Sequence, residues 1–287
     1  MTQLVLSLFP GIGLLDMAFE AEGFCVVQSR DWIMGGDVRN AHFPRGKFDG
    51  VIGGPPCQAF SRLVHMVRQN GHEPKFGNLI PDFERVVDET LPQWFIMEEV
   101  PDAPRPSVKG YANHAFTLNN RQCFDESGEP AAQNRVRAIT FGWLGEFKAL
   151  MIDTCVFQNQ LWEYAACGGS SGTGGIANEK SRGDSDALAR KRGIPIKIGG
   201  SGKVKSTLNK CVGNNVKSES SFARLCRLQG LPDGFLSDSP LTVAGKCKAV
   251  GNGVPLPMGR AIAKAVKEAT EPQAVAERSD GNQITNS

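Results

Sequence analysis

The chain has 287 residues, of which 40% are hydrophobic, and its formal net charge is only +2. This size supports a sizeable core in one large domain, or in one domain that carries an insert. Neither the eight cysteines nor the four histidines show metal-ligand spacing, so the sequence disfavours a zinc site and a secreted disulfide scaffold. No segment resembles a secretion leader or a membrane span, and we expect a cytoplasmic protein with reduced thiols.

The basic residues gather in one segment of the chain. Residues 178–217 carry a local charge of +7, whereas the rest of the chain carries −5. A basic cluster of this kind suggests a polyanionic partner, although such runs are more often solvated loops. The glycine- and serine-rich residues 167–175 before it indicate a flexible connection, and the polar residues from 271 onward indicate a disordered tail.

The predicted elements alternate between strands and helices. Residues 3–9 predict a strand, 10–13 a glycine turn and 14–22 a helix that ends at Gly23, and residues 24–28 predict a second strand. Further strands are predicted at 48–52, 94–97 and 135–141, and further helices at 79–90, 223–228 and 261–269. The order predicts an α/β fold with a doubly wound sheet. The polar stretch 59–78 is predicted to be a loop.

Cys57 occupies a position suited to a nucleophile. It follows two prolines in residues 54–58 (GPPCQ), directly after the apolar strand predicted at 48–52. The prolines stiffen the turn, and ligands of open α/β sheets bind beyond the carboxyl ends of the strands. A single cysteine is more often a small buried hydrophobe, so the other motifs must decide between the two interpretations.

The glycine turn at residues 9–13 (FPGIG) lies between a predicted strand and a predicted helix, where a ligand can approach the backbone. Asp31 follows Gly11 by twenty residues and ends the second strand, the expected place for an acid that binds ribose hydroxyls. Trp32 beside it suits stacking on an adenine. The alternative is an ordinary turn with a half-buried aromatic residue.

Charged residues mark the ends of two other strands. Glu98 ends the strand at 94–97 beside a second acid, where a carboxyl group can hold or deliver a proton near neutral pH. Arg135 and Arg137 alternate in residues 133–137 (QNRVR) and therefore point the same way. Two guanidinium groups on one face need a carboxylate, phosphate or base as partner. Exposed acids and surface ion pairs are the alternatives.

Six segments, taken in this order, resemble the DNA cytosine-5 methyltransferase family. The segments are the cofactor loop at 9–13, the catalytic loop at 54–58, Glu-Glu-Val at 98–100, Q-x-R-x-R at 133–137, and the last two motifs at 227–233 (RLQGLPD) and 251–254 (GNGV). The resemblance covers residues 3–155 and 218–268, and an ordered set of six motifs is highly specific. The compact size is similar to that of bacterial and prophage members.

The resemblance implies a Rossmann-like fold that uses S-adenosyl-L-methionine and carries a small inserted target-recognition domain. The implied division is a first catalytic and cofactor-binding part at 1–155, the target-recognition insert at 156–217, a return to the catalytic domain at 218–270, and a tail at 271–287.

The resemblance also implies the site residues. Cys57, Glu98, Arg135 and Arg137 would be catalytic, with the thiolate adding to carbon 6 of a flipped-out cytosine and carbon 5 accepting the methyl group. The implied cofactor-binding residues are Phe9, Gly11, Ile12, Gly13, Asp31, Trp32, Asp37, Val38, Pro56, Leu79, Asn252, Gly253 and Val254. The implied DNA-binding residues are Gln58, Ser61, Arg62, Arg68 and Gln133.

The expected partner is double-stranded DNA, bound by a monomer without a metal or a membrane, and a restriction enzyme in trans is a possible companion. Two alternatives are the same chemistry on transfer RNA and a non-catalytic relative that binds cofactor or nucleic acid. Three departures from the family pattern stand out. Glu99 replaces the usual asparagine, Leu14 replaces a common glycine, and only five residues separate Asp31 from Asp37.

Overall fold

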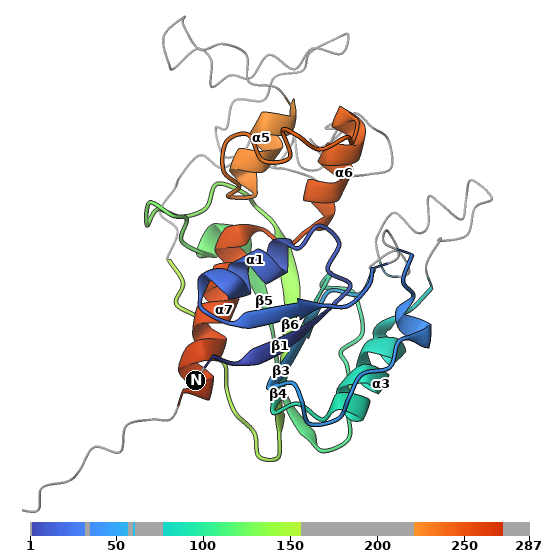
Figure 1. Cartoon of the computed structure of the whole chain (residues 1–287). Helices are drawn as coiled ribbons and strands as arrows, with labels where there is room; N and C mark the ends of the chain where they lie inside the picture. The colour runs from blue at the N-terminus through green and yellow to red at the C-terminus, as the bar shows by residue number, and fades with distance from the viewer. Residues whose placement is uncertain (1, 32–34, 57–59, 61–76, 156–220, 272–287) are drawn as a thin grey trace, which may run out of the picture.

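The computed structural model describes residues 2–31, 35–56, 60, 77–155 and 221–271 (Figure 1). Within these ranges six strands form one sheet in the order β2-β1-β3-β4-β6-β5. They are β1 (Leu4–Leu8), β2 (Cys25–Gln28), β3 (Gly50–Gly53), β4 (Trp94–Glu99), β5 (Tyr111–Asn119) and β6 (Val136–Leu144). Strands β1 to β4 are parallel, and β6 runs antiparallel to both β4 and β5.

Helices cover both faces of the sheet. α1 (Leu14–Ala21) and α7 (Leu256–Thr270) pack on one face, and α3 (Ile80–Thr90) packs on the other (Figure 1). The strands alternate between two cores, so Val5 faces α1 and α7 while Leu6 faces α3. Because both faces are buried along β1, β3 and β4, these strands have nearly continuous apolar sequences, whereas the edge strand β2 is mostly exposed. No helix in the described ranges is long and apolar enough to span a membrane.

A third cluster joins the C-terminal part of the chain to the first helix. α5 (Ser221–Leu228) and α6 (Val243–Asn252) contribute Leu225 and Val250, which pack with Leu14 and Ala18 of α1. Figure 1 shows both helices in orange beyond α1, next to the loop that follows β1. The C-terminal segment therefore lies beside the glycine turn that the sequence marks as the cofactor loop.

The α/β class and the Rossmann-like arrangement are confirmed, with one correction to the helix bounds. The last helix begins at Leu256 rather than at Ala261, and residues 251 and 252 end α6. The sheet is mixed, because β5 and β6 form an antiparallel edge. The predicted insert at 156–217 and almost all of the predicted tail lie outside the described residues, so the domain division stays a prediction.

Candidate active site

The candidate site lies where the parallel strands β1, β3 and β4 end. The glycine turn follows β1, residues 54–56 follow β3, and Glu98 and Glu99 complete β4. Because parallel strands present their carboxyl ends at one edge of the sheet, these three segments converge there.

The glycine turn has an unusual backbone. Phe9, Gly11 and Gly13 all have positive φ, at 56°, 58° and 77°, and Phe9 is a non-glycine residue in the left-handed region. Such strain concentrates at functional sites. Open space surrounds the position that a Gly11 side chain would occupy, and α1 begins at Gly13 without a side-chain cap. The uncapped start of α1 thus presents backbone amide groups that are suited to a ligand.

Two predicted cofactor acids lie after β2. Asp31 accepts a hydrogen bond from the Gly11 amide at 3.0 Å, which links the end of β2 to the glycine turn. Asp37 caps the 3₁₀ helix η2 (Val38–Asn40) and pairs with Arg39 through both carboxylate oxygens. Hydrogen bonds from Arg39 hold the pKa of Asp37 below its ordinary value. Trp32 lies outside the described residues.

The other predicted cofactor residues differ in how much of the side chain is exposed. Ile12, Pro56 and Leu79 are partly buried, whereas Asn252 is exposed and Val254 is buried in the main core. Gly253 packs against Leu14, where an added Cβ would lie 2.5 Å from the leucine Cδ1. The last motif thus lies against the start of α1, directly after the first glycine turn. An open glycine backbone with acids at the end of β2 fits a nucleoside-containing cofactor.

A buried carboxyl group beneath the glycine turn was missed by sequence reasoning. Asp16 is 2% exposed and accepts hydrogen bonds from Ser7 at 2.5 Å and from Gln28 at 2.7 Å. Burial raises the pKa of Asp16. Gly13 lies directly over Gln28, since a Cβ there would be 2.9 Å from its Nε2 atom. The available signal was an acid placed between the apolar residues Leu15 and Met17 near the start of the predicted helix.

Glu98 and Arg137 meet at the catalytic end of the sheet. The Arg137 Nε atom lies 2.8 Å from Glu98 Oε1, and the two side chains are only 16% and 12% exposed. The other carboxylate oxygen of Glu98 borders Gly54, where a Cβ would come within 3.0 Å of it. Glu98 thus lies against the loop that leads to Cys57. Cys57, Gln58, Ser61, Arg62 and Arg68 are outside the described residues.

Arg135 and Gln133 support the site from within the structure. Arg135 is 5% exposed and donates to the carbonyl groups of Gly251 at 3.0 Å and Gly253 at 3.1 Å. Gln133 is completely buried and accepts a hydrogen bond from Asn120. A contact between Gln133 and DNA stays a prediction, and in this structure the Gln133 side chain has no exposed surface. Asn120 in turn accepts from the Met258 amide at the start of α7.

Comparison of the chain with known protein families supports a site of this kind. Residues 33–160 match the family described as C-5 cytosine-specific DNA methylase, and this range includes Cys57, Glu98, Arg135 and Arg137. This part of the chain is therefore similar to the cytosine-5 DNA methyltransferase family.

Individual relatives and a solved structure are similar to this chain. It is 30% identical over 163 residues to the type II methyltransferase M.NgoPII of Neisseria gonorrhoeae, a match that covers 50% of this chain and 45% of the relative. It is 31% identical over 125 residues to M.AquIA of Picosynechococcus, covering 35% and 49%. The chain thus spans about half the length of these relatives. The S. pombe Dnmt2 methyltransferase shares the fold, with a TM-score of 0.53, 13% identity and coverage of 94% of this chain and 100% of that structure.

Glu99 gives the candidate site a buried acid beside Glu98. Its side chain is 2% exposed, and one oxygen accepts a hydrogen bond from the Val100 amide at 2.8 Å. Desolvation by burial raises the pKa of Glu99 to about 8, and the Glu98 charge adds to the effect. The raised pKa lets Glu99 remain neutral at pH 7. In the described part of the chain, no group of three or more His, Cys, Asp or Glu residues is arranged to hold a metal.

Replacing Glu99 with glutamine should make the protein's stability less dependent on pH. The folded protein keeps the Glu99 proton up to about pH 8, whereas the unfolded chain loses it near 4.5. Stability therefore falls as the pH rises between these values, by at most about 1.4 kcal/mol per pH unit. Glu99→Gln keeps the size of the side chain without this titration. Urea unfolding between pH 5 and 8.5 should show that the free energy of unfolding falls less with rising pH in the variant than in the wild type. The same pH dependence in both proteins would contradict a raised pKa for Glu99.

Proposed function

We propose that this chain is a sequence-specific DNA methyltransferase that methylates carbon 5 of a flipped-out cytosine through a covalent Cys57 adduct. The observation that supports it best is the Glu98–Arg137 pair at 2.8 Å, held against Gly54 in the segment that leads to Cys57. A partly buried acid and guanidinium at this position suit the polar edge of a pyrimidine ring.

The chemistry explains why these residue types are needed. Carbon 5 of cytosine reacts poorly with a methyl group until the aromatic ring is disrupted. In the proposed step, the Cys57 thiolate forms a bond to carbon 6, and the electron pair of the ring double bond moves to carbon 5. Carbon 5 would form the new bond to the methyl group while the bond between that methyl group and the positively charged sulfur of the donor breaks, which would leave a neutral thioether. Loss of the carbon-5 proton then expels the Cys57 thiolate and restores the ring.

Glu98 and Arg137 would stabilise the adduct from two sides of the ring. Glu98 would hold a proton at N3, and Arg137 would bind the O2 oxygen as negative charge develops there. Arg135 would act at a distance, because its contacts to Gly251 and Gly253 fix the C-terminal segment against the sheet.

The proposed methyl donor is S-adenosyl-L-methionine, which supplies an electrophilic methyl group on a positively charged sulfur when it is bound. The open backbone at Gly11 and the acids Asp31 and Asp37 would hold its nucleoside and charged parts. Trp32 stays a predicted stacking residue.

The proposed substrate is double-stranded DNA, as the type II methyltransferase relatives favour. The target base must leave the duplex, at a cost of a few kcal/mol. Gln58, Ser61, Arg62 and Arg68 stay predicted DNA contacts, and the basic residues 178–217 would bind the phosphate backbone. Affinity should therefore fall with rising salt. A bacterial cytoplasm and a restriction enzyme in trans stay part of this prediction.

The test is to incubate the protein with S-adenosyl-L-methionine and DNA of mixed sequence, and to map modified cytosines at single-base resolution. Methylation confined to one short sequence is the expected result. Transfer to transfer RNA without transfer to DNA would replace the DNA substrate with RNA. Cofactor binding without transfer to either would support the non-catalytic alternative.

A further inference from the structure

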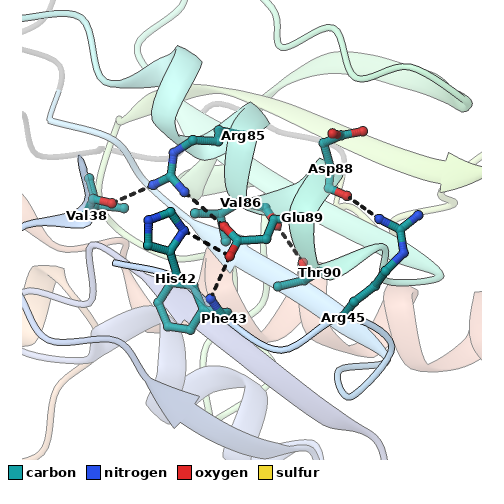
Figure 2. Close-up of polar contacts among 9 residues, drawn as sticks. All are labelled: Val38, His42, Phe43, Arg45, Arg85, Val86, Asp88, Glu89 and Thr90. Carbon is teal, nitrogen blue, oxygen red and sulfur yellow. Dashed lines mark hydrogen bonds and ion pairs between the residues drawn. The ribbon is translucent and has the colours of Figure 1, made fainter. Parts of the chain in front are cut away.

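The segment from Asp37 to Arg45 is anchored by side chains of α3. Apart from the short 3₁₀ helix η2, this segment has no helix or strand of its own. Its backbone is therefore not fixed by pairing with the sheet. Figure 2 shows instead that Arg85 and Glu89, one turn apart on α3, reach across to it.

Arg85 makes the first connection. Its Nη2 atom donates to the Val38 carbonyl at 2.7 Å, and its Nη1 atom donates to Glu89 Oε2 at 2.9 Å (Figure 2). The planar guanidinium can satisfy both acceptors at once. The Val38 carbonyl also ends the 3₁₀ turn by accepting from the Ala41 amide.

Glu89 makes the second connection. Its Oε1 atom accepts from the Phe43 amide at 3.1 Å and lies 3.1 Å from His42 Nδ1. The other oxygen is held by Arg85, so each group orients the other. The pair thus joins α3 to the segment at two points five residues apart, Val38 and Phe43.

Arg85 and Glu89, which we call the clamp, hold a segment that includes two predicted cofactor residues, Asp37 and Val38. Val38 is 8% exposed and packs among the apolar residues that face α3. Asp37, directly before it, is one of the residues that the family resemblance implies for cofactor binding. Only five residues lead from Asp31 to Asp37, so the polypeptide before the turn supplies little additional support.

We propose that Arg85 and Glu89 are positioning residues that hold the cofactor edge formed by Asp37 and Val38. This inference rests on the proposed methyltransferase function. A pair of oppositely charged residues at this spacing also occurs simply to stabilise a helix, usually by a few tenths of a kcal/mol. The two roles make different demands on Arg85, because only the first needs its fork to reach Val38 and Glu89 together.

The experiment compares three variants of the full chain. Arg85→Lys keeps the charge and the helical pairing with Glu89 but loses the two-pronged geometry. Glu89→Gln removes the charge that orients Arg85. Asp88→Asn is the matched control, since it removes an acid from the neighbouring exposed position of the same helix. Calorimetry measures S-adenosyl-L-methionine binding, and amide hydrogen exchange without cofactor measures protection at Ala41 and Phe43.

Both clamp variants should bind S-adenosyl-L-methionine about three- to tenfold more weakly, as expected if the edge is in place only a tenth to a third of the time. Exchange at Ala41 and Phe43 should accelerate in the same variants, and Asp88→Asn should match the wild type in both measurements. The inference about Arg85 and Glu89 would be overturned if Arg85→Lys bound S-adenosyl-L-methionine as tightly as the wild type, or if Asp88→Asn lost as much affinity as the Arg85 and Glu89 variants. Neither result would contradict the proposed methyltransferase function. A wild type that binds no S-adenosyl-L-methionine would overturn the proposed function and this inference together.

Discussion

Cys57→Ala is expected to reduce methyl transfer by at least about 10⁴-fold, because no other group in the proposed mechanism can form the bond to carbon 6. DNA binding should survive, since phosphate contacts and the insert do not depend on the thiol. Single-turnover transfer of labelled methyl groups measures the first effect, and a DNA-binding titration at fixed salt measures the second.

Cys25→Ala is the matched control for this variant. Cys25 is an exposed free cysteine in β2, so its loss tests whether removing any accessible thiol impairs the protein. The control should retain full transfer activity. Wild-type activity in Cys57→Ala would refute a covalent mechanism, and trapping of the wild type on DNA that carries 5-fluorocytosine would support it independently.

Glu98→Gln should lower kcat by about 10²- to 10⁴-fold, the range typical of a lost general acid or base. Glutamine keeps the size of the side chain but cannot supply the proton at N3, and it removes the charge that pairs with Arg137 at 2.8 Å. The affinity for S-adenosyl-L-methionine should stay close to that of the wild type, because Glu98 borders Gly54 rather than the glycine turn.

The matched control is Glu126→Gln, which breaks a second glutamate–arginine pair. Glu126 pairs with Arg260 at 2.9 Å but is 70% exposed, so its loss should change neither kcat nor stability measurably. Thermal unfolding of Glu98→Gln separates a folded, inactive enzyme from a destabilised one. A folded variant with kcat within about threefold of the wild type would show that Glu98 is not the acid.

The sequence predicted the buried parallel strands well because their physical signal is strong. β1, β3 and β4 are continuous apolar runs closed by turn residues, which two-sided burial requires. β5 was missed because it is an edge strand with polar residues such as Asn113 and His114 and is mostly half-exposed. α6 was missed because its glycines lower helix propensity, and packing against α1 and α5 compensates for them.

Partners far apart in the sequence could not be predicted for the candidate site. The alternation of Arg135 and Arg137 indicated that both needed acceptors. It could not show that Arg137 meets Glu98 while Arg135 meets two carbonyl groups more than a hundred residues later. The buried Asp16 network likewise depends on β1, α1 and β2 coming together. Tertiary contacts of this kind leave no short-range periodicity in the sequence.

The Arg135 contacts also have a consequence for how this protein can change over evolutionary time. The chain before residue 156 and the chain after residue 220 are joined directly, by Arg135 to Gly251 and Gly253 and by Leu14 to Gly253. The segment between residues 155 and 221 therefore begins and ends on parts of the chain that contact each other directly. Loop-closure entropy grows only logarithmically, so doubling the length of that segment would cost about 0.6 kcal/mol. If residues 156–217 are the recognition insert, as predicted, a change of recognition sequence would leave the carboxyl ends of β1, β3 and β4 unaltered.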